Sequence, residues 1–557
     1  MNKAYLRHSE GMFDISFHLS SQEFKVNRRF NFTRRLEEPI SNFLSRVNIN
    51  IAKVINKKAK KKKDDNLVEN KEHEVTACLL QNNLLIQDDI PCANVFNINN
   101  DNVILRVLDN DYLIVINAPF VDTITLPNSI LANFPVYPSK FETVYTEKSL
   151  CEFIWYVSKD RKSWVTAGNG FMYTPTNADV NSYLKLSCIP KNTIAEGPLV
   201  EVIADCTIDA SPGECPFEHR HVFTKEKCNS SAFRVITYNI LADLYCDSDF
   251  TRTVLYPYCP PYALHVDYRK QLIIKELLGY NGDIICLQEV DRKVYTYDLE
   301  PVFSSLNYGS NFMLKGGQVA EGLACFYDNS RFRFIEEASI VIADEIGNNS
   351  IFALIWEKIC TNEKLKERLL NRTTALQTVT LENTDSGNLI LLANTHLYFH
   401  PDADHIRLLQ GYITIRYLED IHDKLQEKYK DKNITTIFCG DFNSVPECGI
   451  YQLYTTGFVS ESIIDFKSNA EEAIEGVNLR QQFQLGSACG TPKFTNFTAG
   501  FQDCLDYIYY DKTKLAVEQV IPLPTVEELS QNTALPSVVF PSDHIALVAD
   551  LKCLQNN

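Results

Sequence analysis

Thr435-Thr436-Ile437-Phe438-Cys439-Gly440-Asp441-Phe442-Asn443 is the stretch that decides how this chain folds, because its apolar half predicts a buried strand and its polar half the edge of a sheet. Side chains alternate across a strand, so we expect Asp441 and Asn443 to share one face while Phe442 turns to the core. A carboxylate can bind a hard cation or accept a proton, and an amide can hold a water or a phosphate oxygen. A strand that ends in an Asx turn would explain the same residues without any site.

Similar polar groups recur along the carboxyl-terminal half. We predict strands at 233–240, 283–290, 322–327, 389–396, 435–443, 504–510 and 544–551, and helices at 268–278, 364–370 and 406–428. The polar residues at or near the strand ends are Asn239, Glu289, Asn394, His396, Asp441, Asn443, Asp506, Asp543 and His544. A single buried Glu or His is usually a paired structural group, whereas polar groups at the ends of neighbouring strands form a site.

Composition limits the classes of protein to consider. A chain of 557 residues predicts two or three domains, and 45% hydrophobic with 22% charged residues is typical of a soluble globular protein without a membrane span. The net charge of -17 argues against indiscriminate capture of polyanions, although an acidic enzyme can hold a phosphodiester through divalent cations. The 17 cysteines contain no C-x2-C pair, which favours free thiols in a reducing compartment over zinc sites or disulfides.

The order of segments predicts four regions. Residues 1–71, with the basic block Lys57, Lys58 and Lys60 to Lys63, are predicted to be a flexible arm, either a solvated linker or a tether for RNA or a charged surface. Residues 72–215 predict an immunoglobulin-like β-sandwich around Trp155. Residues 216–231 form a connector whose His219 and His221 we expect at the surface, and 232–557 form the catalytic domain.

Six motifs in order resemble the endonuclease/exonuclease/phosphatase superfamily: Tyr238-Asn239-Ile240-Leu241, Leu287-Gln288-Glu289, Asn394-Thr395-His396, Gly440-Asp441-Phe442-Asn443, Leu505-Asp506-Tyr507-Ile508 and Ser542-Asp543-His544. The resemblance spans about 232–553. It implies a four-layer α/β sandwich, two packed sheets with helices outside, and Mg²⁺-dependent cleavage of phosphodiester or phosphomonoester bonds.

The segment 256–264 with Asp267-Tyr268-Arg269 is similar to the deadenylase branch, which removes poly(A) from 3′ ends. Segments 239–243, 289–292, 488–490 and 517–524 are similar to the 2′,5′-phosphodiesterases of that branch. This implies adenylate-rich RNA and 2′,5′-oligoadenylates as partners, no obligate protein partner, and the mitochondrial matrix or, failing that, the cytoplasm. The amino terminus has arginines but no apolar signal region, and Glu10 and Asp14 are unusual in a transit peptide.

The chemistry of these residue types suggests roles for each. Glu289 is the expected Mg²⁺ ligand, with Asn239, Asp441 and Asn443 beside it and Asp543 for a second cation. Asp441 is expected to deprotonate the attacking water, which Asn443 holds in line. His544, oriented by Asp506, and His396 are expected to bind phosphate oxygens. The expected substrate contacts are Asn394, Tyr256, Tyr262, Arg269 and Asn496, since aromatic faces stack on bases.

Two other functions fit the same pattern. One is a different hydrolase on this fold, such as an inositol-phosphate phosphatase or a sphingomyelinase, because a fold does not determine its substrate. The other is a catalytically silent RNA-binding protein. The sequence leaves open the number of cations and the preference between 2′,5′ and 3′,5′ linkages.

Overall fold

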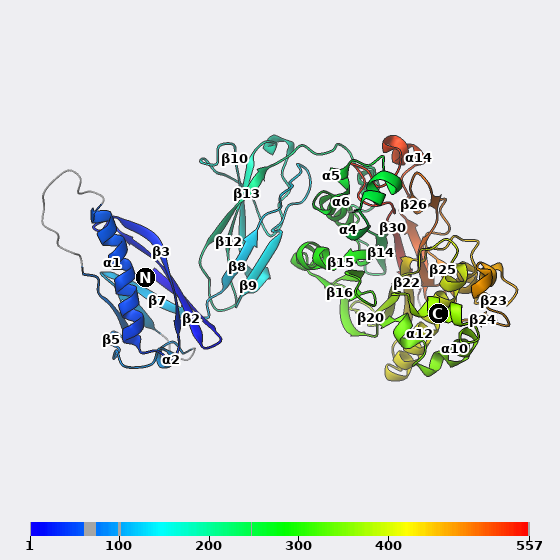
Figure 1. Cartoon of the computed structure of the whole chain (residues 1–557), viewed down its shortest axis with the longest axis horizontal. Coiled ribbons are helices and arrows are strands. Elements are labelled where there is room, and N and C mark those ends of the chain that lie inside the picture. Colours follow the sequence, from blue (N-terminus) through cyan, green and yellow to red (C-terminus); the bar gives the residue numbers. More distant parts are fainter. Residues whose placement is uncertain (1, 61–73, 98–101, 247, 555–557) are drawn as a thin grey trace.

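The computed structural model describes residues 2–60, 74–97, 102–246 and 248–554, which form three successive bodies in Figure 1. An amino-terminal sheet domain ends at residue 116, a β-sandwich covers 118–209, and an α/β domain follows from 216. No helix in this described part of the chain is long and apolar enough to span a lipid bilayer.

The amino-terminal domain is a seven-stranded sheet in the order β3-β2-β1-β7-β6-β4-β5, in which β1 and β7 are parallel. Its elements are β1 (Asn2–Ser9), β2 (Met12–Ser21), β3 (Val26–Arg35), α1 (Ile40–Lys60), β4 (Ala77–Gln81), β5 (Leu84–Leu85), α2 (Cys92–Val95), β6 (Val103–Val107) and β7 (Asn110–Ile116). Apolar residues of α1 recur every three or four positions, at Ile40, Phe43, Val47, Ile51 and Ile55, and pack into the same core as the sheet.

This domain corrects the predicted division of the amino-terminal half. Residues 2–60 are not a flexible arm, and residues 74–116 belong to this sheet and not to the β-sandwich. The basic block concealed an amphipathic helix, because its first lysines lie in the last turn of α1, where Lys57 is exposed. Lys61 to Lys63 lie outside the described residues.

The predicted β-sandwich is confirmed for residues 118–209. Its elements are β8 (Phe120–Thr125), β9 (Lys140–Val144), η1 (Lys148–Leu150), β10 (Glu152–Ser158), β11 (Val165–Asn169), η2 (Asn177–Asp179), β12 (Tyr183–Ile189) and β13 (Val200–Thr207). Trp155 is fully buried, and its indole Nε1 donates to the carbonyl of Gly170 at 2.9 Å. The sandwich contacts the α/β domain through Tyr137, whose hydroxyl donates to Asp298 at 2.9 Å.

The predicted connector is part of the α/β domain. It contains α3 (Pro216–Arg220) and η3 (His221–Phe223). The buried Arg220 guanidinium donates to the Tyr280 hydroxyl at 2.6 Å and to two carbonyls at 2.9 Å. His219 is exposed, as expected, whereas His221 is half-buried with its Nε2 atom 3.1 Å from the carbonyl oxygen of Glu276.

The α/β domain has the four layers implied by the resemblance. One sheet has the order β16-β17-β15-β14-β30-β29, and the second the order β18-β20-β21-β22-β28-β25 with β19 beside β20. Apolar side chains such as Val235, Cys286 and Ile437 fill the space between the sheets. Helices α6 and α8 cover the outer face of the first sheet, and α12, α13 and α11 that of the second.

The bounds of these elements complete the description. The strands are β14 (Ala232–Asn239), β15 (Ile284–Asp291), β16 (Tyr308–Leu314), β17 (Glu321–Asp328), β18 (Phe332–Glu337), β19 (Ile340–Val341), β20 (Ala375–Asn383), β21 (Leu389–His396), β22 (Ile434–Asp441), β23 (Phe458–Val459), β24 (Leu479–Arg480), β25 (Leu485–Ser487), β26 (Asn496–Phe497), β27 (Gln502–Asp503), β28 (Asp506–Asp511), β29 (Leu515–Val520) and β30 (Leu547–Cys553). The helices are α4 (Asp243–Cys246), η4 (Thr251–Leu255), α5 (Pro261–Leu264), α6 (Val266–Gly279), α7 (Arg292–Val294), η5 (Tyr295–Leu299), α8 (Glu300–Ser305), α9 (Ile342–Glu345), η6 (Ser350–Phe352), α10 (Ala353–Ile359), α11 (Glu363–Leu370), α12 (Asp404–Lys428), α13 (Gly449–Thr456), η7 (Ile464–Lys467), η8 (Ala470–Glu472), α14 (Val526–Leu529) and η9 (Ser530–Asn532).

Candidate active site

The two sheets meet at a cluster of polar side chains where β14, β15, β21 and β22 end. Asn239, the last residue of β14, donates from Nδ2 to Glu289 Oε1 at 2.9 Å and to Asp441 Oδ2 at 3.0 Å. Glu289 belongs to the first sheet and Asp441 to the second. One amide therefore joins the carboxylates of both sheets, and all three side chains are buried.

Glu289 reaches the site through a local break in its strand. It adopts a φ of 55°, and the pairing of β15 with β17 shifts between Leu287 and Val290. A bulge of this kind re-aims a side chain. Its Oε2 accepts a hydrogen bond from the Ala242 amide at 2.9 Å. Burial and the neighbouring Glu321 carboxylate raise the pKa of Glu289 to about 7.

Asp441, Asp506 and His544 form a second buried group. His544 Nδ1 lies 2.8 Å from Asp506 Oδ2, and its Nε2 lies 3.6 Å from Asp441 Oδ2. Burial disfavours the charged form of His544, but the carboxylates of Asp506 and Asp441 outweigh burial and raise its pKa well above the ordinary value. Burial raises the pKa of Asp441 to about 6, although the charge of His544 opposes the shift. Asp441 is therefore placed as a proton acceptor beside His544, a charged donor.

His396 contacts Asp441 from the other side. Its Nε2 lies 3.5 Å from Asp441 Oδ2, and its Nδ1 lies 3.0 Å from Lys315 Nζ. Burial, and then the charges of Lys315 and His544, lower the pKa of His396 well below its ordinary value. Because an ammonium only donates, Nδ1 accepts and the proton of the neutral ring is on Nε2. His396 thus presents a neutral N–H to the site.

Asn443 does not sit as the strand alternation predicted. β22 ends at Asp441, and Asn443 has a φ of 48°, so the two residues do not share the face of a strand. The Asn443 amide N–H donates to Asp441 Oδ1 at 2.9 Å, which is an Asx turn, and its side chain donates to the Leu397 carbonyl at 3.0 Å. The turn and the site are therefore both present, and the turn orients the Asp441 carboxylate.

Asp543 lies next to His544 and is held by two of the residues predicted to bind substrate. Its Oδ2 accepts from the hydroxyl of the buried Tyr256 at 2.9 Å and from Asn496 Nδ2 at 3.2 Å. Asn496 also pairs with His544 through a backbone bridge. Tyr256 and Asn496 thus position the loop that carries Asp543 and His544.

Two other predicted substrate contacts are structural. Asn394 is fully buried between the sheets, where it donates to the Leu287 carbonyl at 3.0 Å and accepts from Gln288 Nε2 at 2.8 Å. Arg269 is 1% exposed and donates to the carbonyls of the loops after β14 and before His544. Neither side chain is accessible to a substrate. Tyr262 is 60% exposed and remains available to a ligand.

Lys315 and Glu321 are site residues that the sequence reasoning missed. They flank the loop between β16 and β17 and form a salt bridge with a distance of 2.6 Å, and the Tyr245 hydroxyl donates to the same Glu321 oxygen at 3.2 Å. Glu321 is fully buried beside Glu289. The available signal was a charged residue on each side of a glycine-containing hairpin loop, Lys315-Gly316-Gly317 and Glu321-Gly322.

The donor set fits a hard divalent cation. Carboxylate and amide oxygens of Glu289, Asn239 and Asp441 are the ligand types that Mg²⁺ prefers. Asp441, Asp506 and His544 also place one ligand atom each within 4.8 Å of one another. His544 Nδ1 is already engaged by Asp506 Oδ2 at 2.8 Å. The position beside Glu289 is therefore better suited to the cation.

Comparisons with known proteins identify the family of this chain. The model of the Endonuclease/Exonuclease/phosphatase family matches residues 236–544, and that of the 2′,5′-phosphodiesterase 12-like N-terminal domain matches 118–209. The 2′,5′-phosphodiesterase 12 of Mus musculus is 38% identical over 580 residues, covering 98% of this chain and 93% of the mouse protein. The chain belongs to the 2′,5′-phosphodiesterase 12 group of this family. It is thus an enzyme, a hydrolase with a phosphodiesterase domain.

More distant proteins match a smaller part of the chain. A CCR4-Not complex 3′-5′-exoribonuclease subunit, Ccr4 of Candida albicans, is 30% identical to this chain over 343 residues. The match covers 59% of this chain and 42% of the Candida protein. The structure of ANGEL2, a 2′,3′-cyclic phosphatase, aligns with a TM-score of 0.48 and 23% identity, covering 59% of this chain and 97% of that chain.

Proposed function

We propose that this enzyme is a Mg²⁺-dependent 3′-exoribonuclease that hydrolyses 2′,5′-oligoadenylates and 3′,5′-linked poly(A) tails and releases AMP. The observation that carries the proposal is the contact of Asn239 with both Glu289 and Asp441, which builds one centre from two sheets. The name of the mouse relative supports cleavage of 2′,5′ linkages, and that of the Candida relative, an exoribonuclease working in the 3′-5′ direction, supports cleavage of ordinary RNA from its 3′ end. Adenylate-rich RNA is therefore the proposed partner.

The roles of the residues follow from their protonation states. Asp441 accepts the proton of the attacking water, because its carboxylate is buried and its pKa is already raised. The charged His544, held by Asp506, and the neutral His396 donate to non-bridging phosphate oxygens. Glu289 and Asn239, with Asp543 for a second ion, would hold Mg²⁺, which supplies positive charge against the phosphate when bound.

Asn443 acts through its neighbour Asp441 in this scheme. The Asn443 N–H keeps Asp441 Oδ1 occupied, so that Oδ2 is the oxygen directed at His396 and His544. Tyr256 and Asn496 hold Asp543 beside His544. Exposed aromatic side chains such as Tyr262 are suited to stacking on adenine.

The proposed location is the mitochondrial matrix, with the cytoplasm as the alternative. All 17 cysteines are free thiols, and this supports either location because both are reducing compartments. Fluorescence microscopy and fractionation of the tagged full chain distinguish the two, and a secreted pool would contradict both.

The test uses purified full-length protein with 2′,5′- and 3′,5′-linked adenylate trimers, with and without Mg²⁺. We expect AMP release that needs Mg²⁺ and is abolished by Glu289→Gln. The matched control is Glu336→Gln, since Glu336 is a partly exposed carboxylate on β18 paired with Lys428. Hydrolysis of inositol phosphates or sphingomyelin in place of adenylates, or no hydrolysis at all, would contradict the proposal.

A further inference from the structure

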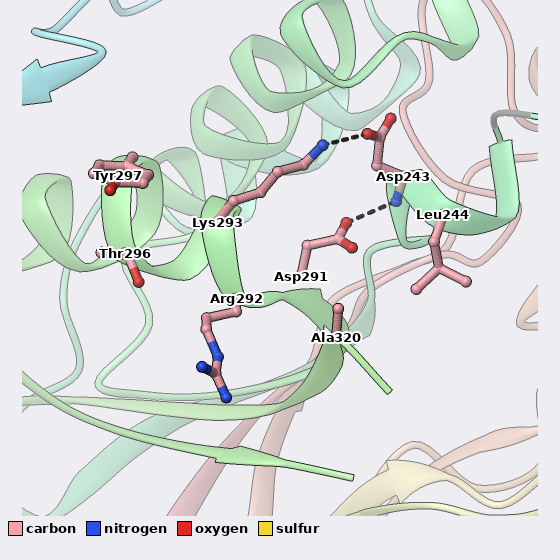
Figure 2. Close-up of a pocket in the computed structure, with 8 residues that line it drawn as sticks. All are labelled: Asp243, Leu244, Asp291, Arg292, Lys293, Thr296, Tyr297 and Ala320. Atoms are coloured by element: carbon pink, nitrogen blue, oxygen red, sulfur yellow. Dashed lines mark hydrogen bonds and ion pairs between the residues drawn. The ribbon is translucent and has the colours of Figure 1, made fainter. Parts of the chain in front are cut away.

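A hollow of about 650 Å³ is lined by Asp291 and Arg292, which follow Glu289 in the chain, and by none of the residues given a role so far. Figure 2 shows its lining residues: Asp243, Leu244, Asp291, Arg292, Lys293, Thr296, Tyr297 and Ala320. They come from the start of α4, the turn from β15 into α7, the helix η5 and the loop before β17. We refer to this feature as the side hollow.

Three of the four segments of the side hollow adjoin a residue of the active site, and the fourth, η5, follows α7. Ala242, which donates to Glu289, precedes Asp243, and Asp291 and Arg292 follow two and three residues after Glu289. The Asp243 amide donates to Asp291 Oδ2 at 2.7 Å. Two residues of a strand span roughly 7 Å. The side hollow is therefore within one nucleotide of the position where the scissile phosphate would lie.

The charges of the side hollow leave one cation free. Lys293 Nζ forms a 2.5 Å salt bridge with Asp243, drawn as a dashed line in Figure 2. Asp291 is buried and accepts the Asp243 N–H. Arg292 is exposed, and within the described ranges its guanidinium has no hydrogen bond or ion pair. An exposed, unpaired guanidinium beside a phosphodiesterase centre is suited to a phosphate.

The side hollow also offers apolar and aromatic surface. Tyr297 is 39% exposed and Leu244 is 43% exposed. Figure 2 places Arg292 on one side of the α7 turn and Lys293 on the other, with Tyr297 one helical turn further on. Figure 2 shows Tyr297 and Leu244 at opposite ends of the side hollow, so the ring of Tyr297 and the free guanidinium of Arg292 are the groups that fit a nucleoside and its phosphate better than a peptide or a lipid.

We propose that the side hollow binds the nucleotide attached to the scissile phosphate on its leaving side, with the base against Tyr297 and its next phosphate against Arg292. The inference rests on the proposed function and adds to it a substrate subsite. A dinucleotide with hydroxyl ends has only the scissile phosphate, whereas a trimer has the phosphate that Arg292 would bind. The contribution of Arg292 should therefore begin at the trimer.

The experiment compares KM and kcat for adenylate dimers, trimers and tetramers with 5′-hydroxyl ends. We expect Arg292→Gln to raise KM for the trimer and tetramer about tenfold, with kcat and the dimer unchanged. The slope of log KM against log salt for the trimer should also fall by about 0.7, as for one lost phosphate contact. The control is Lys424→Gln, which removes one exposed charge from α12. An equal effect on dimer and trimer, or none on either, overturns the assignment.

A second variant tests the base. We expect Tyr297→Ala to raise KM roughly 5- to 150-fold for all three lengths, while Tyr297→Phe retains the wild-type KM because the ring remains. Equal loss in both variants would show that the hydroxyl, and not stacking, is used, and would overturn the base assignment. Failure of wild type to hydrolyse any adenylate refutes the proposed function and this subsite with it, whereas hydrolysis with unaltered length dependence refutes the subsite alone.

Discussion

Arg269 offers the sharpest distinction between a substrate contact and a structural role. Its Nε donates to the Leu264 carbonyl at 2.9 Å, and its Nη1 donates to the carbonyls of Ile240, Leu241 and Pro541 at 3.1, 2.8 and 3.2 Å. Ile240 and Leu241 follow Asn239 in the chain, and Pro541 precedes the loop that carries His544. Arg269→Met keeps much of the side-chain length but leaves four buried acceptors without their donor. We expect a loss of about 3–5 kcal/mol in the free energy of unfolding of the α/β domain.

The assay is urea unfolding of the full chain together with turnover of an adenylate trimer below the transition. We expect a lower midpoint and a lower kcat, since Asn239 and His544 lose their support, with little change in KM. The control is Arg333→Met, because Arg333 is exposed on β18, the edge strand of the second sheet, and pairs with Glu382. A raised KM with an unchanged midpoint would refute the structural role and restore the substrate contact predicted from the sequence.

Three further outcomes follow from buried groups. Burial raises the pKa of Glu276 to about 7, so the free energy of unfolding should fall as pH rises from 4 to 7. Glu276→Gln should remove up to roughly 3–4 kcal/mol of that fall. Parallel curves of unfolding free energy against pH for the wild type and the variant would contradict this. His544→Ala should lower kcat about 10² to 10³-fold and abolish the loss of activity at high pH, since the charged form is present below a raised pKa and is lost above it; identical pH profiles would exclude this role. A Cβ at Gly440 would lie 2.3 Å from the Thr395 carbonyl oxygen, so Gly440→Ala should lower the free energy of unfolding by about 1–3 kcal/mol, measured by thermal unfolding. An unchanged melting temperature would show that β21 and β22 can separate there.

The strand pattern predicted most of the α/β domain, because buried strands with polar ends are local features. Asn239, Glu289, His396, Asp441, Asp506 and His544 meet as expected. Depth along a strand was harder to predict. Asn394 and His396 are two residues apart and share a face of β21, but Asn394 lies further into the domain and binds the other sheet. Periodicity indicates a face and not a distance from the sheet edge.

Long-range contacts and irregular backbone account for the other differences. The φ of 55° at Glu289 and 48° at Asn443 arises from a bulge and a turn that strand alternation does not contain. The carbonyls bound by Arg269 come from segments up to 272 residues away, so its burial could not be read from its own neighbours. In the amino-terminal domain, the apolar spacing of α1 was present in the sequence, and the lysines at its end obscured it.

The position of β30 has a consequence for the order of biosynthesis. This strand is near the carboxyl terminus, yet it pairs with β14 in the middle of the first sheet, and His544 comes just before it. The contacts between Asn239 and Asp441 and between His544 and Asp506 both cross from one sheet to the other. A chain whose synthesis has stopped short of β30 has no complete first sheet to dock. A growing polypeptide therefore has no assembled hydrolytic centre until β30 has been synthesised.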